Sequence, residues 1–147
     1  MIRSLVTLIL IVATVEATGK NITFTNCVDT GKINWVTVDP CESEPCTFQP
    51  AMDVTVQGEL VSVSTSTAPK LEVQVNVLGF WTTYPDLDSD GCKYLTCPLT
   101  AEKATAFKIV LTTLDWLPPM KTQIRFILYD NDGVTELNCA QADIKIA

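Results

Sequence analysis

The sequence predicts an all-β fold in which about seven strands form a two-sheet sandwich. Several short segments alternate apolar and polar side chains, which is the period of a strand with one buried face. These segments recur at regular intervals, and no window longer than one or two turns carries a helical period. Regularly spaced short strands of this kind are typical of β-sandwiches.

The predicted strands can be placed from this alternation. They cover residues 21–24, 33–38, 52–60, 71–77, 107–112, 123–129 and 137–146. The segments 52–60 and 71–77 are separated by a short polar stretch, which predicts a hairpin. The run Asp130-Asn-Asp-Gly133 predicts the turn of another hairpin, because its residues tolerate the backbone angles of tight turns.

The first residues have the form of a secretory signal peptide. Arg3 precedes an apolar run over residues 5–13, and Val15-Glu-Ala17 is a small-x-small cleavage site. The run is shorter than the roughly 20 residues that a membrane helix requires. We therefore expect a signal peptide at residues 1–17 and a secreted, extracellular single domain at residues 18–147.

Six cysteines follow the predicted leader, and secreted chains of this size use cysteines as disulfides. Fifteen pairings of six cysteines are possible. Four residues separate the members of two close pairs, which favours local bridges and leaves the first and last cysteines as partners. The favoured pairs are Cys41–Cys46, Cys92–Cys97 and Cys27–Cys139. Structural zinc is disfavoured, because the chain has no His and no CxxC pair.

The composition argues against catalysis, metal binding and nucleic-acid binding. Hydrolysis by a Ser or Cys nucleophile needs a base, commonly His, and the chain has none. The segment Asp86-Leu-Asp-Ser-Asp-Gly91 resembles half of a calcium loop, but Cys97 occupies the closing position, so we expect a hydrated acidic turn. A net charge of -7 disfavours phosphate backbones. We expect no enzyme activity, no metal, no cofactor and no nucleic-acid partner.

The inward-facing residues are mostly Val, Ile and Leu, whereas the aromatic residues gather near predicted loops. This pattern fits an ordinary valine-rich sandwich core, and alternation alone does not distinguish such a core from one that contains a cavity. The Cys92–Cys97 bridge precedes the apolar strand at 107–112. We expect this short disulfide loop to stand at the mouth of any space that the strands enclose.

The order of the cysteine motifs resembles a known family. The motifs are Cys27, Ser43-Glu-Pro-Cys46, Asp90-Gly-Cys92, Cys97-Pro-Leu99 and Asn138-Cys-Ala140. Together they resemble the secreted lipid-recognition (ML) family, which includes the Niemann-Pick type C2 sterol carriers and the mite group 2 allergens. The resemblance implies an immunoglobulin-like two-sheet β-sandwich with an internal apolar cavity, pairing of the first and last cysteines, and a lipid held between the sheets.

The expected binding residues come from two sources. Inward alternation predicts the walls as Val54, Val56, Val73, Val75, Val77, Phe107, Ile109, Leu111, Ile124, Phe126 and Leu128. The resemblance places the mouth at Tyr84, Thr113 and Leu117. Thr113 and Leu117 stand where the sterol carriers have an aliphatic and an aromatic residue, so the pattern departs from theirs at both positions.

The expected function is therefore a secreted, monomeric lipid-binding or transfer protein for a sterol, fatty acid or other apolar ligand. The alternative is an adaptor that presents a microbial lipid or a semiochemical to a receptor. A receptor or a membrane-protein acceptor is a possible partner in either case. Asn21-Ile-Thr23 is a glycosylation sequon, so we also expect a glycan at Asn21.

Overall fold

The computed structural model describes residues 19–147, so the predicted signal peptide lies outside the described residues. The strands are β1 (Lys20–Asn21), β2 (Thr25–Asn26), β3 (Lys32–Asp39), β4 (Cys46–Phe48), β5 (Asp53–Val61), β6 (Lys70–Val77), β7 (Phe80–Thr83), β8 (Ala104–Thr112), β9 (Met120–Tyr129) and β10 (Glu136–Ile146), and η1 (Gly91–Lys93) is one turn of 3-10 helix.

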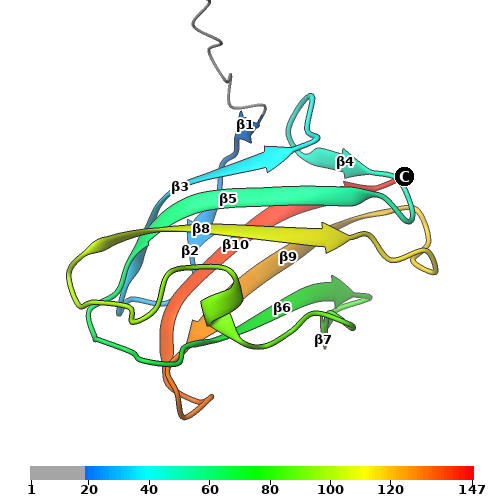
Figure 1. Ribbon diagram of the computed structural model, residues 1–147. Coiled ribbons are helices and arrows are strands. Elements are labelled where there is room, and N and C mark those ends of the chain that lie inside the picture. The colour runs from blue at the N-terminus through cyan, green and yellow to red at the C-terminus, as the bar shows by residue number, and fades with distance from the viewer. Residues whose placement is uncertain (1–18) are drawn as a thin grey trace, which may run out of the picture.

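The strands form two sheets that lie face to face (Figure 1). One sheet has the order β1-β3-β5-β8, and the other has the order β2-β10-β9-β6-β7 with β4 parallel to the end of β10. Within the described chain, β3, β5, β6, β8, β9 and β10 each have eight or more residues. The predicted β-sandwich is confirmed, and the short strands β1, β2, β4 and β7 lie beside these six.

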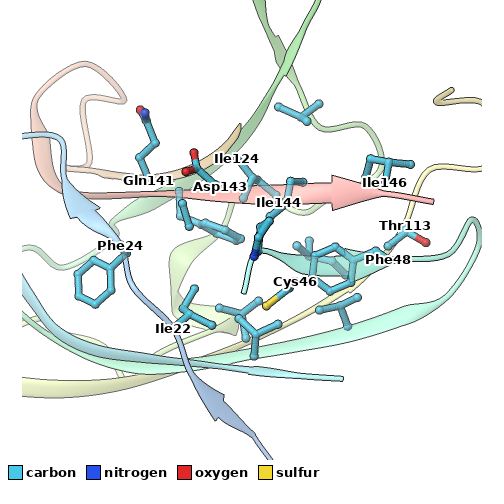
Figure 2. Close-up of a pocket in the computed structure, with 18 of the residues that line it drawn as sticks. Ile22, Phe24, Cys46, Phe48, Thr113, Ile124, Gln141, Asp143, Ile144 and Ile146 are labelled. Atoms are coloured by element: carbon cyan, nitrogen blue, oxygen red, sulfur yellow. The ribbon is translucent and has the colours of Figure 1, made fainter. Parts of the chain in front are cut away.

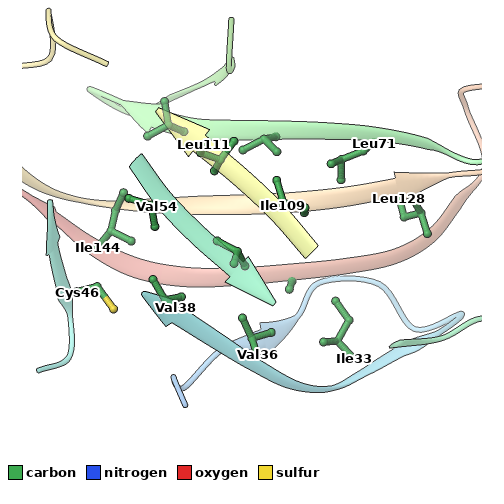
Figure 3. Packing of buried hydrophobic residues seen from close by; sticks show 14 of the residues in the cluster. Ile33, Val36, Val38, Cys46, Val54, Leu71, Ile109, Leu111, Leu128 and Ile144 are labelled. Atoms are coloured by element: carbon green, nitrogen blue, oxygen red, sulfur yellow. The ribbon is translucent and has the colours of Figure 1, made fainter. Parts of the chain in front are cut away.

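The core forms where the inner faces of the two sheets meet. In β5, Val54, Val56 and Leu60 are buried while the residues between them are partly exposed, as the alternation predicts. Antiparallel pairing sets Val54 opposite Leu111 and Val56 opposite Ile109 on β8. Figure 3 shows Val54, Ile109 and Leu111 in the space between the two sheets, together with Leu71 and Leu128 of the second sheet.

The predicted hairpin between residues 52–60 and 71–77 is wrong. The two segments are β5 and β6, and they lie in different sheets. The polar stretch between them carries the chain across the sandwich, and it is held by its own hydrogen bonds. Ser66 exchanges backbone hydrogen bonds with Leu99, and its hydroxyl donates to Asp130. A half-buried strand alternates in the same way in either sheet, so its partner could not be assigned from the alternation.

The first predicted strand is also interrupted. The alternation predicts one strand over residues 21–24, but β1 pairs with β3 in one sheet and β2 pairs with β10 in the other. The residues between them, Ile22 to Phe24, cross from sheet to sheet. We call this stretch the crossing segment. In contrast, the turn at Asp130-Asn-Asp-Gly133 joins β9 to β10 as predicted, and Gly133 takes the positive φ of 70° there.

The described residues form three disulfides, which are the pairs favoured by spacing. They are Cys27–Cys139, Cys41–Cys46 and Cys92–Cys97. The first lies within one sheet, because Cys27 follows β2 and donates its backbone N–H to the carbonyl of Cys139 on β10. Cys139 lies opposite Ile127, a buried residue on the face of β9 that points away from the core.

The Cys92–Cys97 loop packs near the start of β8 and of β6. The N–H of Gly91 donates to the carbonyl of Pro69 at 2.9 Å, and a Cβ at Gly91 would lie 2.6 Å from that oxygen. Leu95 is buried and forms a β-bridge with Phe107. This loop therefore closes the side of the sandwich near residue 107, away from the end of β8 where the main cavity described below is found.

Removing the long-range disulfide should cost more stability than removing the short one in the Cys92–Cys97 loop. The Cys27–Cys139 bridge spans 112 positions and the Cys92–Cys97 bridge spans 5. In the chain-entropy model these correspond to about 4.7 and about 2 kcal/mol. We expect urea unfolding of the two paired Cys→Ala variants to reproduce this order. Equal losses would show that the long-range bridge does not act mainly on the unfolded chain.

Candidate functional site: an apolar cavity between the sheets

A cavity of about 290 Å³ lies between the two sheets, and we call it the main cavity. Protein interiors rarely contain voids larger than one water molecule, so a space of this size is not a packing defect. It lies near the lower limit of ligand pockets, which begin at about 300 Å³, and it exceeds the apolar cavity of about 150 Å³ that accepts benzene. The space is therefore large enough for part or all of a small apolar ligand.

Many of the expected binding residues line the main cavity. They are Val54, Val56, Val75, Tyr84, Leu111, Thr113, Leu117, Ile124 and Phe126. These residues come from both sheets, because Val54 pairs with Leu111 in one sheet and Val75 pairs with Ile124 in the other. Ile124 and Phe126 remain partly exposed although they face inward. The cavity accordingly has apolar walls on both sides.

The other expected wall residues lie elsewhere. Val73 is only 1% exposed and packs within the core, and Val77 is partly buried at the end of β6. Phe107, Ile109 and Leu128 line a separate space of about 40 Å³, which we call the deep cavity. Alternation identified these residues as inward-facing, but it carries no information on which part of the inner face stays unfilled.

The expected binding residues leave out several parts of the main cavity, which include Val38 of β3, Phe48 of β4 and Leu114 after β8. Another missed part is the inner face of β10, which contributes Ala140, Ala142, Ile144 and Ile146. These residues alternate with Gln141, Asp143 and Lys145, so the pattern that selected the other walls could have selected them too. Figure 2 shows Gln141 and Asp143 pointing away from the side of β10 on which Cys46 and Phe48 lie.

Two further missed parts are the crossing segment and the Cys41–Cys46 loop. Ile22, Thr23 and Phe24 line the cavity together with Glu44 and Pro45. Thr23 donates from its backbone N–H and its hydroxyl to the Glu44 carboxylate, which ties the two segments together. Since Thr23, Glu44 and Pro45 are exposed, the cavity reaches the protein surface beside this contact.

Tyr84 closes the opposite side of the cavity. Its backbone N–H donates to the carbonyl of Val73 on β6, and its hydroxyl donates to the carbonyl of Thr112 at the end of β8. The side chain therefore spans the gap between the edges of the two sheets. Burial raises the pKa of the Tyr84 hydroxyl, so it stays protonated and able to donate.

Thr113 and Leu117 lie at the cavity end of the loop between β8 and β9. The Thr113 hydroxyl donates to the carbonyl of Gln49 at 2.5 Å and accepts from the N–H of Met52 at 2.8 Å. It therefore joins two loops and is not free to contact a ligand with its hydroxyl. Leu117 is 7% exposed and lines the cavity with its apolar side chain.

The acidic turn before the Cys92–Cys97 loop uses its carboxylates internally. Asp88 accepts from the N–H of Asp90 and forms an ion pair with Lys93, and Asp90 accepts from the N–H of Cys92. Across residues 19–147, no group of three or more metal-ligating side chains is close enough to hold an ion. None of the helices in that range is long and apolar enough to cross a membrane.

The fold and the cavity together define a β-sandwich that encloses a ligand-sized apolar space. A family model described as ML domain matches residues 21–146. The chain therefore belongs to the ML-domain family, and the resemblance inferred from the cysteine motifs is confirmed. A mite group 2 allergen of Tyrophagus putrescentiae is 26% identical over 140 residues, covering 94% of this chain and 97% of the allergen.

The chain is also similar to a cholesterol transporter and to two solved structures. NPC intracellular cholesterol transporter 2 of Bos taurus is 27% identical over 133 residues, covering 89% of each chain. A Niemann-Pick type C2 protein from Japanese carpenter ant has a TM-score of 0.75 at 16% identity, covering 86% of this chain and 100% of that one. Chicken MD-1 complexed with lipid IVa has a TM-score of 0.54 at 13% identity, covering 83% and 87%. These two structures share the fold.

Filling the main cavity should remove ligand binding and leave the fold intact. Val75→Trp places a large side chain in the space that Val75 lines, so overpacking should cost less than the usual 1–3 kcal/mol. We expect the affinity for a fluorescent fatty acid to fall about tenfold or more.

The matched control for Val75→Trp is Val110→Trp. Val110 is 52% exposed on the outer side of β8, so this variant adds the same side chain away from the main cavity. It should bind like the wild type. Equal binding by all three proteins would place the ligand outside the main cavity.

Proposed function

We propose that the protein is a secreted lipid-binding or transfer protein that holds one apolar ligand in the main cavity. The observation that carries this proposal is the 290 Å³ space with walls of Val, Ile, Leu and Phe from both sheets. Each buried methylene of a ligand would contribute about 0.8 kcal/mol, before the costs of association. A long acyl chain or a sterol suits such a site better than a polar metabolite does.

The walls favour this function over a catalytic one. The polar side chains at the main cavity are those of Thr23, Glu44, Tyr84 and Thr113, since Gln141 and Asp143 point to the other side of β10. Thr23, Glu44 and the hydroxyls of Tyr84 and Thr113 are engaged in protein hydrogen bonds. We infer that these groups hold the edges of the cavity in place, while apolar contact supplies the affinity.

The proposal also covers the processing, location and oligomeric state of the protein. We propose cleavage after Ala17, secretion and a monomeric state, with a glycan at Asn21. Asn21 is exposed on β1, so a glycan there would meet no part of the core. The fatty acid, sterol and semiochemical classes all remain compatible with an apolar cavity.

The ligand can be identified by native mass spectrometry of protein purified from its natural source. We expect one lipid per protein chain, with dissociation releasing a single apolar molecule. A transfer assay between vesicles then separates the two roles. Ready exchange with vesicles supports a carrier, whereas a complex with a receptor that forms only when lipid is bound supports an adaptor. Recovery of the protein without any lipid, together with no binding of added lipids, would overturn the proposal.

Truncating Tyr84 should accelerate ligand exchange. Tyr84→Ala removes the side chain that spans the edges of β6 and β8, so the gap beside the cavity widens. We expect the association and dissociation rates of a fluorescent lipid to rise together in stopped-flow measurements, with affinity changing less than either rate because the walls stay in place. Tyr84→Phe keeps the ring and loses the hydrogen bond to Thr112, so it should give a smaller acceleration.

A comparison on the other side of the cavity tests where the ligand passes. Glu44→Ala removes the carboxylate that holds Thr23 of the crossing segment. If exchange is faster in Glu44→Ala and unchanged in Tyr84→Ala, the ligand passes beside the crossing segment and Tyr84 is only a wall residue.

A further inference from the structure

β8 is a long strand at the edge of its sheet, and an edge strand can accept a further strand through its unpaired backbone groups. It has 9 residues and lies at the end of the order β1-β3-β5-β8 (Figure 1). The other edges are formed by β1, β2, β4 and β7, which have 2, 2, 3 and 4 residues. β8 pairs with β5 without a register shift, so no bulge interrupts it. Within the described chain, β8 is therefore the least protected sheet edge.

The hydrogen bonds at the two ends of this edge show which backbone groups point away from β5. Residues of an antiparallel strand alternate between those that bond to the partner strand and those that point away from it. The N–H of Lys108 donates to the carbonyl of Tyr94 at 2.9 Å, on the side away from β5. The N–H of Thr113 donates to the carbonyl of Met52, just before β5. The backbone groups of Lys108, Val110 and Thr112 therefore point to the free edge.

Only part of the free edge is covered by the rest of the protein. Near the start of β8, the Cys92–Cys97 loop covers the edge, because Leu95 forms a β-bridge with Phe107. At the end of β8, the hydroxyl of Tyr84 donates to the carbonyl of Thr112. Among the described residues, no hydrogen bond reaches the four groups between these contacts. They are the carbonyl of Lys108, the N–H and carbonyl of Val110 and the N–H of Thr112, and we call them the open edge.

A surface groove of about 420 Å³ lies beside the open edge. It is bounded by residues 84–87 on one side and by residues 110–116 on the other. Val110 is 52% exposed and Trp116 is 59% exposed, so the groove presents apolar surface to solvent. Among the residues that line it, Asp86 and Asp115 are acidic and none is basic. The groove therefore favours an extended segment that carries both apolar and positively charged side chains.

We propose that the open edge of β8 is a docking site for an extended basic segment of a partner protein, which adds to the four-stranded sheet as a further strand. Backbone hydrogen bonds to Val110 and Thr112 hold such a segment, and its alternate side chains provide selectivity. At about 3.4 Å per residue, a segment of about five residues covers the open edge.

Charge favours this partner over a second copy of the chain. Pairing of two β8 edges would bring Asp86 and Asp115 of two chains together, and each chain has a net charge of -7. The position of the groove also suits a partner that acts at the lipid site. Tyr84, Leu111, Thr113 and Leu114 line both the groove and the main cavity, so a docked strand would lie against the cavity wall.

The test uses amide hydrogen exchange, followed by NMR on the mature protein, with the peptide acetyl-Val-Lys-Val-Lys-Val-amide as the probe. In the free protein, the amides of Val110 and Thr112 should exchange rapidly and those of Ile109 and Leu111 slowly, because only the latter bond to β5. With the peptide at about ten times its Kd, exchange at Val110 and Thr112 should slow by about tenfold. The corresponding peptide with Glu in place of Lys should give less protection.

Val110→Pro removes one donor of the open edge. Its N–H points away from β5, so proline removes no hydrogen bond of the β5–β8 pair. We expect the peptide to give no protection at Thr112 in this variant, whereas Val110→Thr should behave like the wild type. Fatty-acid binding should be unchanged in both, because Val110 does not line the main cavity.

Two further comparisons do not depend on the folding of Val110→Pro. A peptide of the same sequence with every amide N-methylated keeps the side chains and charges but cannot donate, so it should give no protection to the wild type. Replacing both acidic residues in Asp86→Asn/Asp115→Asn should lower the affinity for the Lys peptide by about fivefold, as expected for two exposed ion pairs.

The remaining results would overturn the docking site. They are equal binding of the N-methylated peptide, unchanged exchange at Val110 and Thr112 with every peptide, or undiminished binding to Val110→Pro. Protection that rises with protein concentration in the absence of peptide would instead assign the open edge to a second copy. Fatty-acid binding measured on the same samples tests the proposed function separately, so each proposal can fail without the other.

Discussion

The hydrogen bond from the Tyr84 hydroxyl to the carbonyl of Thr112 joins the edges of the two sheets on one side of the main cavity. On the other side, the crossing segment passes from one sheet to the other and is tied by Thr23 to Glu44. The free energy falls when two apolar inner faces approach each other, so without other contacts the sheets would close the space between them. The segments at both edges hold the sheets at a separation that leaves the cavity open.

The sequence predicted the strands well because each half-buried strand carries its own pattern. The alternation in residues 71–77 and 123–129 identified β6 and β9 and their inward residues, and the spacing of the cysteines indicated the disulfides. The pairing of strands was less accessible. The polar stretch after β5 has the composition of a hairpin loop, although it crosses to the other sheet. Alternation along one strand does not indicate which other strand is its partner.

The candidate site could be predicted only in part, for a related reason. Alternation shows which side chains face inward, so Val75 and Ile109 looked equivalent. In the structure, Val75 lines the main cavity and Ile109 lines the deep cavity, because the local distance between the sheets differs along their length. In the sequence, Asn138 stands out only as part of the motif Asn138-Cys-Ala140. Its burial depends on a register shift in β10 that the sequence pattern does not show.

The main cavity also has a consequence for the volume of the protein. Unfolding eliminates internal voids, so a folded chain that encloses 290 Å³ should lose volume on unfolding and be sensitive to hydrostatic pressure. A lipid bound in the cavity would occupy this void, so less volume would be lost on unfolding and the sensitivity to pressure would fall. The volume change of unfolding, measured from the pressure dependence of stability, should therefore report how completely a given ligand fills the space between the sheets.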